Sequence, residues 1–176
     1  MPWQPEDWTE WTAGRGVEHA CPGAHLAVVR GILRRLPDRD GLLAVALTHG
    51  HLEPLALGAY FGRVVTVDVD GDDALPADAD VVLALDALPA VGLAARLARV
   101  HGALAEGGVL IATLPARVGA TRPFKLGGEP ARGLHEVELQ WLLRRTGYQG
   151  LRLRRIPAEP PEPTRLLCMA VRRALN

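Results

Sequence analysis

The sequence has no serine, one lysine (Lys125) and two cysteines among its 176 residues. Without serine, the chain cannot use a serine nucleophile. Cys21 and Cys168 are too few for a disulfide framework, and such scarcity is typical of reducing compartments. The opening segment MPWQPEDWTEW also has neither the basic nor the apolar region of a secretory signal. We therefore expect a cytoplasmic protein.

Long apolar runs and an excess of charge of one sign are absent too. No run approaches the roughly 20 apolar residues that a membrane helix needs, so we expect no contact with a membrane. Twenty basic and 20 acidic side chains give a formal net charge of +0. This balance argues against a broad electrostatic contact with nucleic acid.

Hydrophobic residues are abundant, at 48% of the chain, and predict a single globular domain over 1–176. A tryptophan-rich arm, residues 1–24, opens it. We expect Trp3, Trp8 and Trp11 to anchor this arm by burying their indole rings. The alternatives are a lid over a pocket and a contact between the subunits of a homodimer.

The spacing of apolar residues alternates between helical and strand-like along the chain. It predicts helices at 24–36, 51–61, 91–104 and 135–146, and strands at 42–47, 63–68, 81–85, 109–114, 151–156 and 165–174. This order predicts an α/β fold: a three-layer, Rossmann-like, doubly wound and mostly parallel sheet with a C-terminal antiparallel strand pair. The link 69–80 is too short for a crossover helix. Either the strands that it joins are not neighbours, or a helix–strand unit is missing.

The stretch 42–68 has the order strand, turn, helix, strand, acid, which is typical of adenosine sites. Gly50 lies in the turn and Asp68 ends the second strand. Asp68 is expected to accept both ribose hydroxyls, or else to be an ordinary turn acid. Asp86 follows the strand 81–85 at the carboxyl edge, where ligands bind in such sheets, although it could also cap a short turn.

Three stretches together resemble the class I S-adenosylmethionine-dependent methyltransferases: ALTHGHLEPLALGAYFGRVVTVD, ADVVLALDAL with LARVHGALAEGGVLIATLP, and LHEVELQWLLRRTGYQGLRLRRI. They span 24–175 in the family's order. The resemblance implies S-adenosylmethionine as cofactor, and it implies direct methyl transfer to a small-molecule or protein substrate that the sequence does not identify. The cofactor-binding residues that it implies are Ala46, Leu47, Thr48, Gly50, Asp68 and Asp86.

The chain departs from the family's first loop, which usually reads acid, apolar, Gly, x, Gly, x, Gly. Of these positions, 44–50 here, only Gly50 keeps its glycine; Ala44 replaces the acid, and Ala46 and Thr48 replace glycines. Their Cβ atoms are expected to narrow the space for the methionine moiety. The short link also removes the family's third strand or its preceding helix, a region that often contacts adenine. A catalytically inactive binding or partner module of the same fold is therefore the alternative function.

Histidines and cysteines give weaker signals. His49 and His51 could be acid–base groups of an altered pocket with other chemistry, but no partner is identifiable from spacing. His19, Cys21 and His25 match no standard zinc spacing, so no metal is expected. Catalytic residues therefore stay unassigned.

Most arginines are expected on the solvent-exposed faces of helices and strands. Arg96 and Arg99 are predicted on the outer face of the helix 91–104, and arginines also alternate along the strand 151–156. The glycine- and proline-rich loop 115–133 carries Arg122, Lys125 and Arg132. These could contact an anionic substrate or be solvated.

Overall fold

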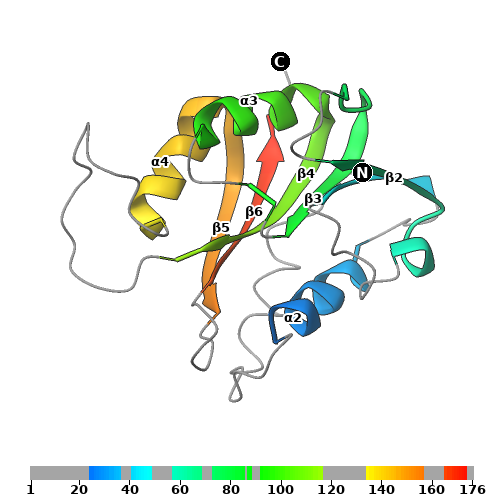
Figure 1. Ribbon diagram of the computed structural model, residues 1–176, viewed down its shortest axis with the longest axis horizontal. Helices are drawn as coiled ribbons and strands as arrows, with labels where there is room; N and C mark the ends of the chain where they lie inside the picture. The colour runs from blue at the N-terminus through cyan, green and yellow to red at the C-terminus, as the bar shows by residue number, and fades with distance from the viewer. Residues whose placement is uncertain are drawn as a thin grey trace.

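A computed structural model describes residues 24–36, 41–48, 57–68, 73–85, 87–88, 92–116, 134–156 and 165–173. Within these ranges the chain forms three α-helices, one short 3-10 helix and six strands (Figure 1). In chain order the elements are α2 (Ala24–Leu33), β1 (Leu43–Thr48), η3 (Leu57–Ala59), β2 (Arg63–Asp68), β3 (Ala79–Leu85), α3 (Leu93–Ala103), β4 (Leu104–Pro115), α4 (Glu136–Thr146), β5 (Tyr148–Ile156) and β6 (Arg165–Arg172).

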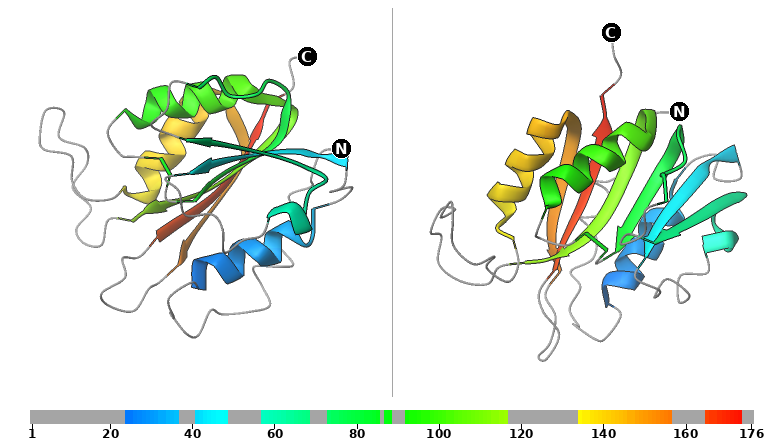
Figure 2. Two further views of the ribbon diagram at one scale, coloured as in Figure 1. Left: turned by 45° about the vertical axis from the view of Figure 1, so that its right-hand side comes forward. Right: turned by 45° about the horizontal axis from the view of Figure 1, so that its top comes forward.

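The strands form one sheet in the order β2-β1-β3-β4-β6-β5. The first four are parallel, whereas β6 runs antiparallel to both β4 and β5. α3 and α4 cover one face of the sheet and α2 covers the other (Figures 1 and 2). The predicted three-layer fold with a C-terminal antiparallel pair is confirmed.

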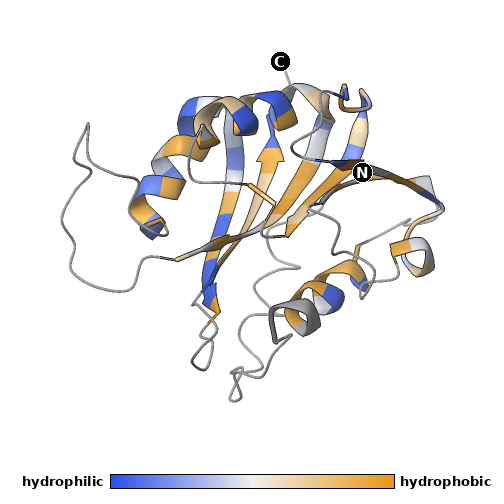
Figure 3. Ribbon diagram, in the orientation of Figure 1, coloured by the Kyte–Doolittle hydropathy of each residue, from blue (hydrophilic) through white to orange (hydrophobic). Residues whose placement is uncertain are grey.

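The central strands are buried on both faces. Successive side chains of a strand point to opposite faces, so a strand covered on both sides needs an unbroken apolar run. Val45, Val82 and Leu110 join the cluster beneath α3 and α4. Ala44, Leu83 and Ile111 join the cluster with α2. Figure 3 shows these strands as largely hydrophobic bands, whereas β5 at the sheet edge alternates.

The short link between β2 and β3 has a simple explanation. Both strands pair with β1, which lies between them, so they are not neighbours. The link must run back along the length of a strand, about 20 Å, to reach the start of β3. Ten residues can do this, because they extend to roughly 33 Å. Residues 73–76 form no regular element and 77–78 form a turn, where Asp78 has a φ of 60°. The described part of the link thus contains no helix and no strand.

The predicted helix at 51–61 is only partly visible. Residues 51–56 lie outside the described residues, and 57–59 form the 3-10 helix η3. Leu57 and Phe61 are buried against α2. The first predicted helix is also shorter than expected, because α2 ends at Leu33 and a turn follows.

α4 has defined ends. His135 Nδ1 accepts a hydrogen bond from the Val137 N–H at 3.3 Å, and Glu138 Oε2 accepts one from the His135 N–H at 3.0 Å. This reciprocal capping box satisfies donors that the first turn leaves unpaired. Gly147 ends the helix with a φ of 103°, a conformation that favours glycine.

Three side chains join the C-terminal end of α3 to β5 and β6. The Tyr148 hydroxyl donates to the Leu97 carbonyl at 3.1 Å, and the Arg172 guanidinium donates to the Leu104 carbonyl. The His101 ring packs edge-on against Tyr148, with centroids 5.0 Å apart. Arg172 also donates to the carbonyl of Gly102 at 3.4 Å, one of the last carbonyls of α3, which lack a partner within the helix.

The stability of the fold is expected to fall in mild acid because of His101. Burial lowers the pKa of this histidine below its usual 6.5, and its buried Nε2 has no hydrogen-bond partner among the described residues. Below pH 6.5 the unfolded chain therefore binds a proton that the folded chain resists, so the free energy of unfolding decreases as pH falls. Urea unfolding between pH 7.5 and 5 should show this decrease. This decrease should be smaller in His101→Gln. It should persist in the control His135→Asn, which keeps a capping side chain. A decrease in His101→Gln equal to that of the wild type would contradict the assignment of the pH dependence to His101.

Asp80 is expected to stabilise the pairing of β1 with β3. Its Oδ2 accepts a hydrogen bond from the Leu43 N–H at 2.8 Å, one position before the ladder begins at Ala44 and Val81. Asp80→Ala should lower the free energy of unfolding by about 1–3 kcal/mol, because it leaves a part-buried N–H unpaired. Asp80→Asn keeps an acceptor oxygen and should lose less. Urea unfolding at pH 7 measures both, and a wild-type value for Asp80→Ala would exclude this role.

Candidate functional site

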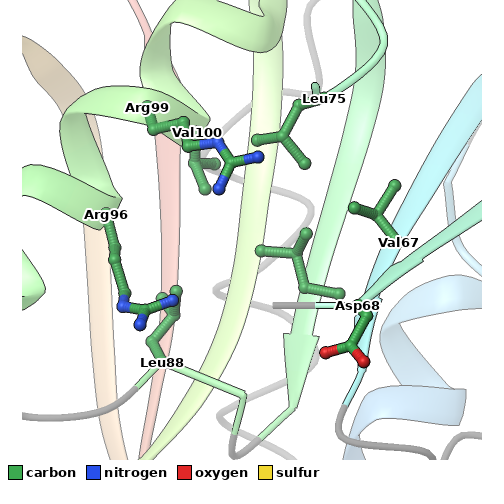
Figure 4. Close-up of a pocket in the computed structure, with 8 residues that line it drawn as sticks. Val67, Asp68, Leu75, Leu88, Arg96, Arg99 and Val100 are labelled. Carbon is green, nitrogen blue, oxygen red and sulfur yellow. The ribbon is translucent and has the colours of Figure 1, made fainter. Parts of the chain in front are cut away.

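A hollow opens on the α3 side of the sheet, beside the carboxyl ends of β1 and β2 (Figure 4). Ligands of open α/β sheets bind at this edge. The hollow measures about 260 Å³, including space open to solvent. The residues that line it are Leu47, Val67, Asp68, Leu75, Leu88, Arg96, Arg99 and Val100.

The floor of the hollow is apolar and rigid. Leu47 of β1 and Val67 of β2 are register partners, and both are almost completely buried. Leu88, after β3, and Val100 of α3 are equally buried. Leu75, from the link that precedes β3, is partly buried against the same cluster. A flat apolar group could therefore rest here without disturbing the core.

The rim of the hollow carries charges of both signs. Asp68, the last residue of β2, is exposed at one side, and Arg96 and Arg99 of α3 lie across the hollow from it (Figure 4). The Arg99 guanidinium donates to the backbone carbonyl of Asp73, which ties the link to α3. The site can thus offer acceptor oxygens on one side and guanidinium donors on the other.

The helical period of α3 explains the placement of the arginines. Leu93, Leu97 and Val100 are spaced by four and three residues and are buried in the core. Arg96 and Arg99 are three residues apart, so they share a helix face. That face borders the hollow, because Val100 also lines it.

The structure brings together two of the predicted cofactor residues, Leu47 and Asp68. Ala46 is fully buried in the cluster with α2, on the opposite face of the sheet, so its methyl group does not narrow the hollow. Thr48 pairs with Asp68 at the strand ends, but its side chain lies outside the described residues, as do Gly50 and Asp86. The binding roles of these residues stay predictions.

The sequence did not identify Arg96 and Arg99 as site residues. A helix face exposed to solvent and one that faces a ligand have the same spacing of polar residues. Leu75 and Leu88 were missed as well. The sequence did hold one indication that these arginines could face a ligand. They lie on the helix that directly follows β3, and ligands of such sheets bind at the carboxyl ends of the strands.

The other candidates are mostly untested. His19, Cys21, His49, His51 and the three cations of the loop 115–133 lie outside the described residues, as does the His25 side chain. Cys168 is a fully buried residue of β6, and burial raises the pKa of its thiol to about 12. A buried neutral thiol is a poor nucleophile. The described ranges hold no group of three or more metal-ligating side chains, and none of their helices is long and apolar enough to cross a membrane.

No family model and no curated protein matches the sequence. Solved structures do match the fold. The [4+2]-cyclase SpnF aligns with a TM-score of 0.64 at 12% identity, over 92% of this chain and 86% of the cyclase. The 1,6-didemethyltoxoflavin-N1-methyltransferase of Burkholderia thailandensis, solved with S-adenosylhomocysteine, aligns at 0.59 and 19% identity over 97% and 87%. The magnesium protoporphyrin IX methyltransferase of Synechocystis, solved with SAM (S-adenosylmethionine), aligns at 0.58 and 17% over 95% and 90%.

The fold that the chain shares with these structures is the class I methyltransferase fold. The CurJ carbon methyltransferase has it too, with a TM-score of 0.58 at 16% identity, but the present chain spans only 54% of that structure. Because all these identities are below 20%, the likeness shows the methyltransferase fold and not the reaction. SpnF illustrates this limit, because it shares the fold and is named as a [4+2]-cyclase, not as a methyltransferase.

Proposed function

We propose that this protein binds S-adenosylmethionine, with its adenosine in the hollow, and is a small methyltransferase. The observation that carries the proposal is the position of Asp68, at the carboxyl end of β2 beside an apolar floor. Two of the similar structures are methyltransferases solved with SAM or S-adenosylhomocysteine. The methyl acceptor, a small molecule or a protein, is left open by this proposal.

The described residues fit the adenosine part of the cofactor. The Asp68 carboxylate has two oxygens and can accept a hydrogen bond from each ribose hydroxyl. Leu47, Val67 and Leu88 offer the apolar surface on which a purine ring would rest. Because its volume of about 260 Å³ includes space open to solvent, the hollow can receive only part of the cofactor. The segment around Gly50, outside the described residues, would then receive the amino-acid end.

The cofactor supplies an activated methyl group, and the protein's task is to align the acceptor with it. Such alignment is worth several kcal/mol and needs no strong base. The described part of the site, with one carboxylate and two guanidinium groups, is therefore compatible with transfer. The buried Cys168 takes no part, because it lies within the core cluster.

A partner or binding module without transfer activity is the second candidate. The small size of the hollow favours it, as does the loss of glycines from the first loop, where only Gly50 remains. Ala46, however, is not an argument for it, because its side chain faces α2 and not the hollow.

Calorimetric titration with S-adenosylmethionine and S-adenosylhomocysteine separates the two candidates. Methyltransferase function predicts that both bind. Asp68→Asn should weaken binding about 10- to 100-fold, because a charge-assisted hydrogen bond contributes about 1.5–3 kcal/mol.

Asp78→Asn is the matched control: it removes the same charge from the exposed end of the link, where Asn tolerates the left-handed φ of 60°. It should bind like the wild type. No binding of either ligand at millimolar concentration would eliminate the methyltransferase and leave the module. Equal affinity of Asp68→Asn and wild type would refute the ribose contact.

A further inference from the structure

We propose that Arg96 and Arg99 hold the anionic group of the methyl acceptor, which is then a small molecule with an apolar body and a carboxylate or phosphate. This inference rests on the proposed methyltransferase function and names the substrate class for it. Both arginines line the hollow, and their guanidinium groups lie across it from Asp68 (Figure 4).

The two arginines are placed to act together on one anion. They are three residues apart on α3, so their side chains leave the same helix face. A guanidinium presents five N–H donors in a plane, a geometry that suits the two oxygens of a carboxylate or phosphate. The bond from Arg99 to the Asp73 carbonyl uses one donor and helps to fix the orientation of the group.

Their support is rigid. Leu97 and Val100 of α3 are almost completely buried, so the helix cannot shift without disturbing the core. Arg96 itself is partly buried. Partial burial strengthens an ion pair with a ligand, because water screens it less.

Charge then decides which ligand lies where. Among the described residues, the charged side chains that line the hollow are those of Asp68, Arg96 and Arg99, with a sum of +1. A sulfonium is a cation, so repulsion keeps it away from the arginines and the cofactor belongs on the Asp68 side. The arginine side attracts an anion. Leu75 and Val100 line the hollow beside it and favour an apolar body over a small inorganic anion.

The test uses simple probes, because the natural acceptor is unidentified. Benzoate and phenyl phosphate carry the two candidate anionic groups on one apolar ring, benzamide is the uncharged counterpart, and inorganic phosphate is the anionic group without a ring. Ligand-observed NMR should be run on the full-length protein, with and without S-adenosylhomocysteine. We expect benzoate or phenyl phosphate to bind at least tenfold more tightly than benzamide or inorganic phosphate. The better of the two identifies the anionic group.

Arg96→Gln and Arg99→Gln should each weaken the binding of the preferred anion about tenfold. Their affinity for S-adenosylhomocysteine should stay unchanged. Arg144→Gln removes the same charge from the exposed end of α4 and should change neither. Arg96→Lys keeps the charge but not the planar fork, and it should bind the anion with intermediate affinity. Thermal melting of each variant confirms that it is folded.

Benzamide binding as tightly as benzoate and phenyl phosphate, or anion affinity unchanged in both glutamine variants, overturns the inference. If S-adenosylhomocysteine binds and no anionic probe does, this inference fails and the proposed function stands. If an anion binds and S-adenosylhomocysteine does not, the proposed function fails, and the acceptor role of the arginines fails with it.

Discussion

The position of β1 between β2 and β3 is the constraint on which the rest of the structure depends. β1 forms parallel ladders with both neighbours, and the Leu43 N–H continues the bonding to the Asp80 carboxylate. Because β1 is covered on both faces, its sequence must be apolar throughout. Its register with β2 sets Leu47 beside Val67 and brings both strands to the same carboxyl edge, which creates the ligand-facing hollow.

Most of the fold could be predicted because its signals are local. Unbroken apolar runs marked the buried strands, and helical periods marked α3 and α4. The short link 69–80 was the exception: its length left two explanations open, because sequence does not reveal which strands are neighbours. The structure resolves this by placing β1 between β2 and β3. The expected single-domain organisation and the tryptophan-rich arm stay predictions.

The candidate site could be predicted only in part. Asp68 was identifiable because a carboxylate after a strand has a recognisable context. Arg96 and Arg99 were not, because a polar helix face does not reveal what lies opposite it. Ala46 was expected to narrow the cofactor space, but the pleat turns its side chain toward α2. The position of a residue along a motif therefore does not by itself determine the face on which it acts.

The central claim is that an adenosine binds on the floor formed by Leu47, Val67 and Leu88, with Asp68 at its edge. Amide chemical shifts of the labelled protein, followed during addition of S-adenosylhomocysteine, test this most directly, because they report the position of binding as well as its strength. We predict saturable shifts at these four residues, with smaller changes on β5 at the far edge of the sheet. Shifts confined to other parts of the sheet, or none at millimolar ligand, would contradict the claim.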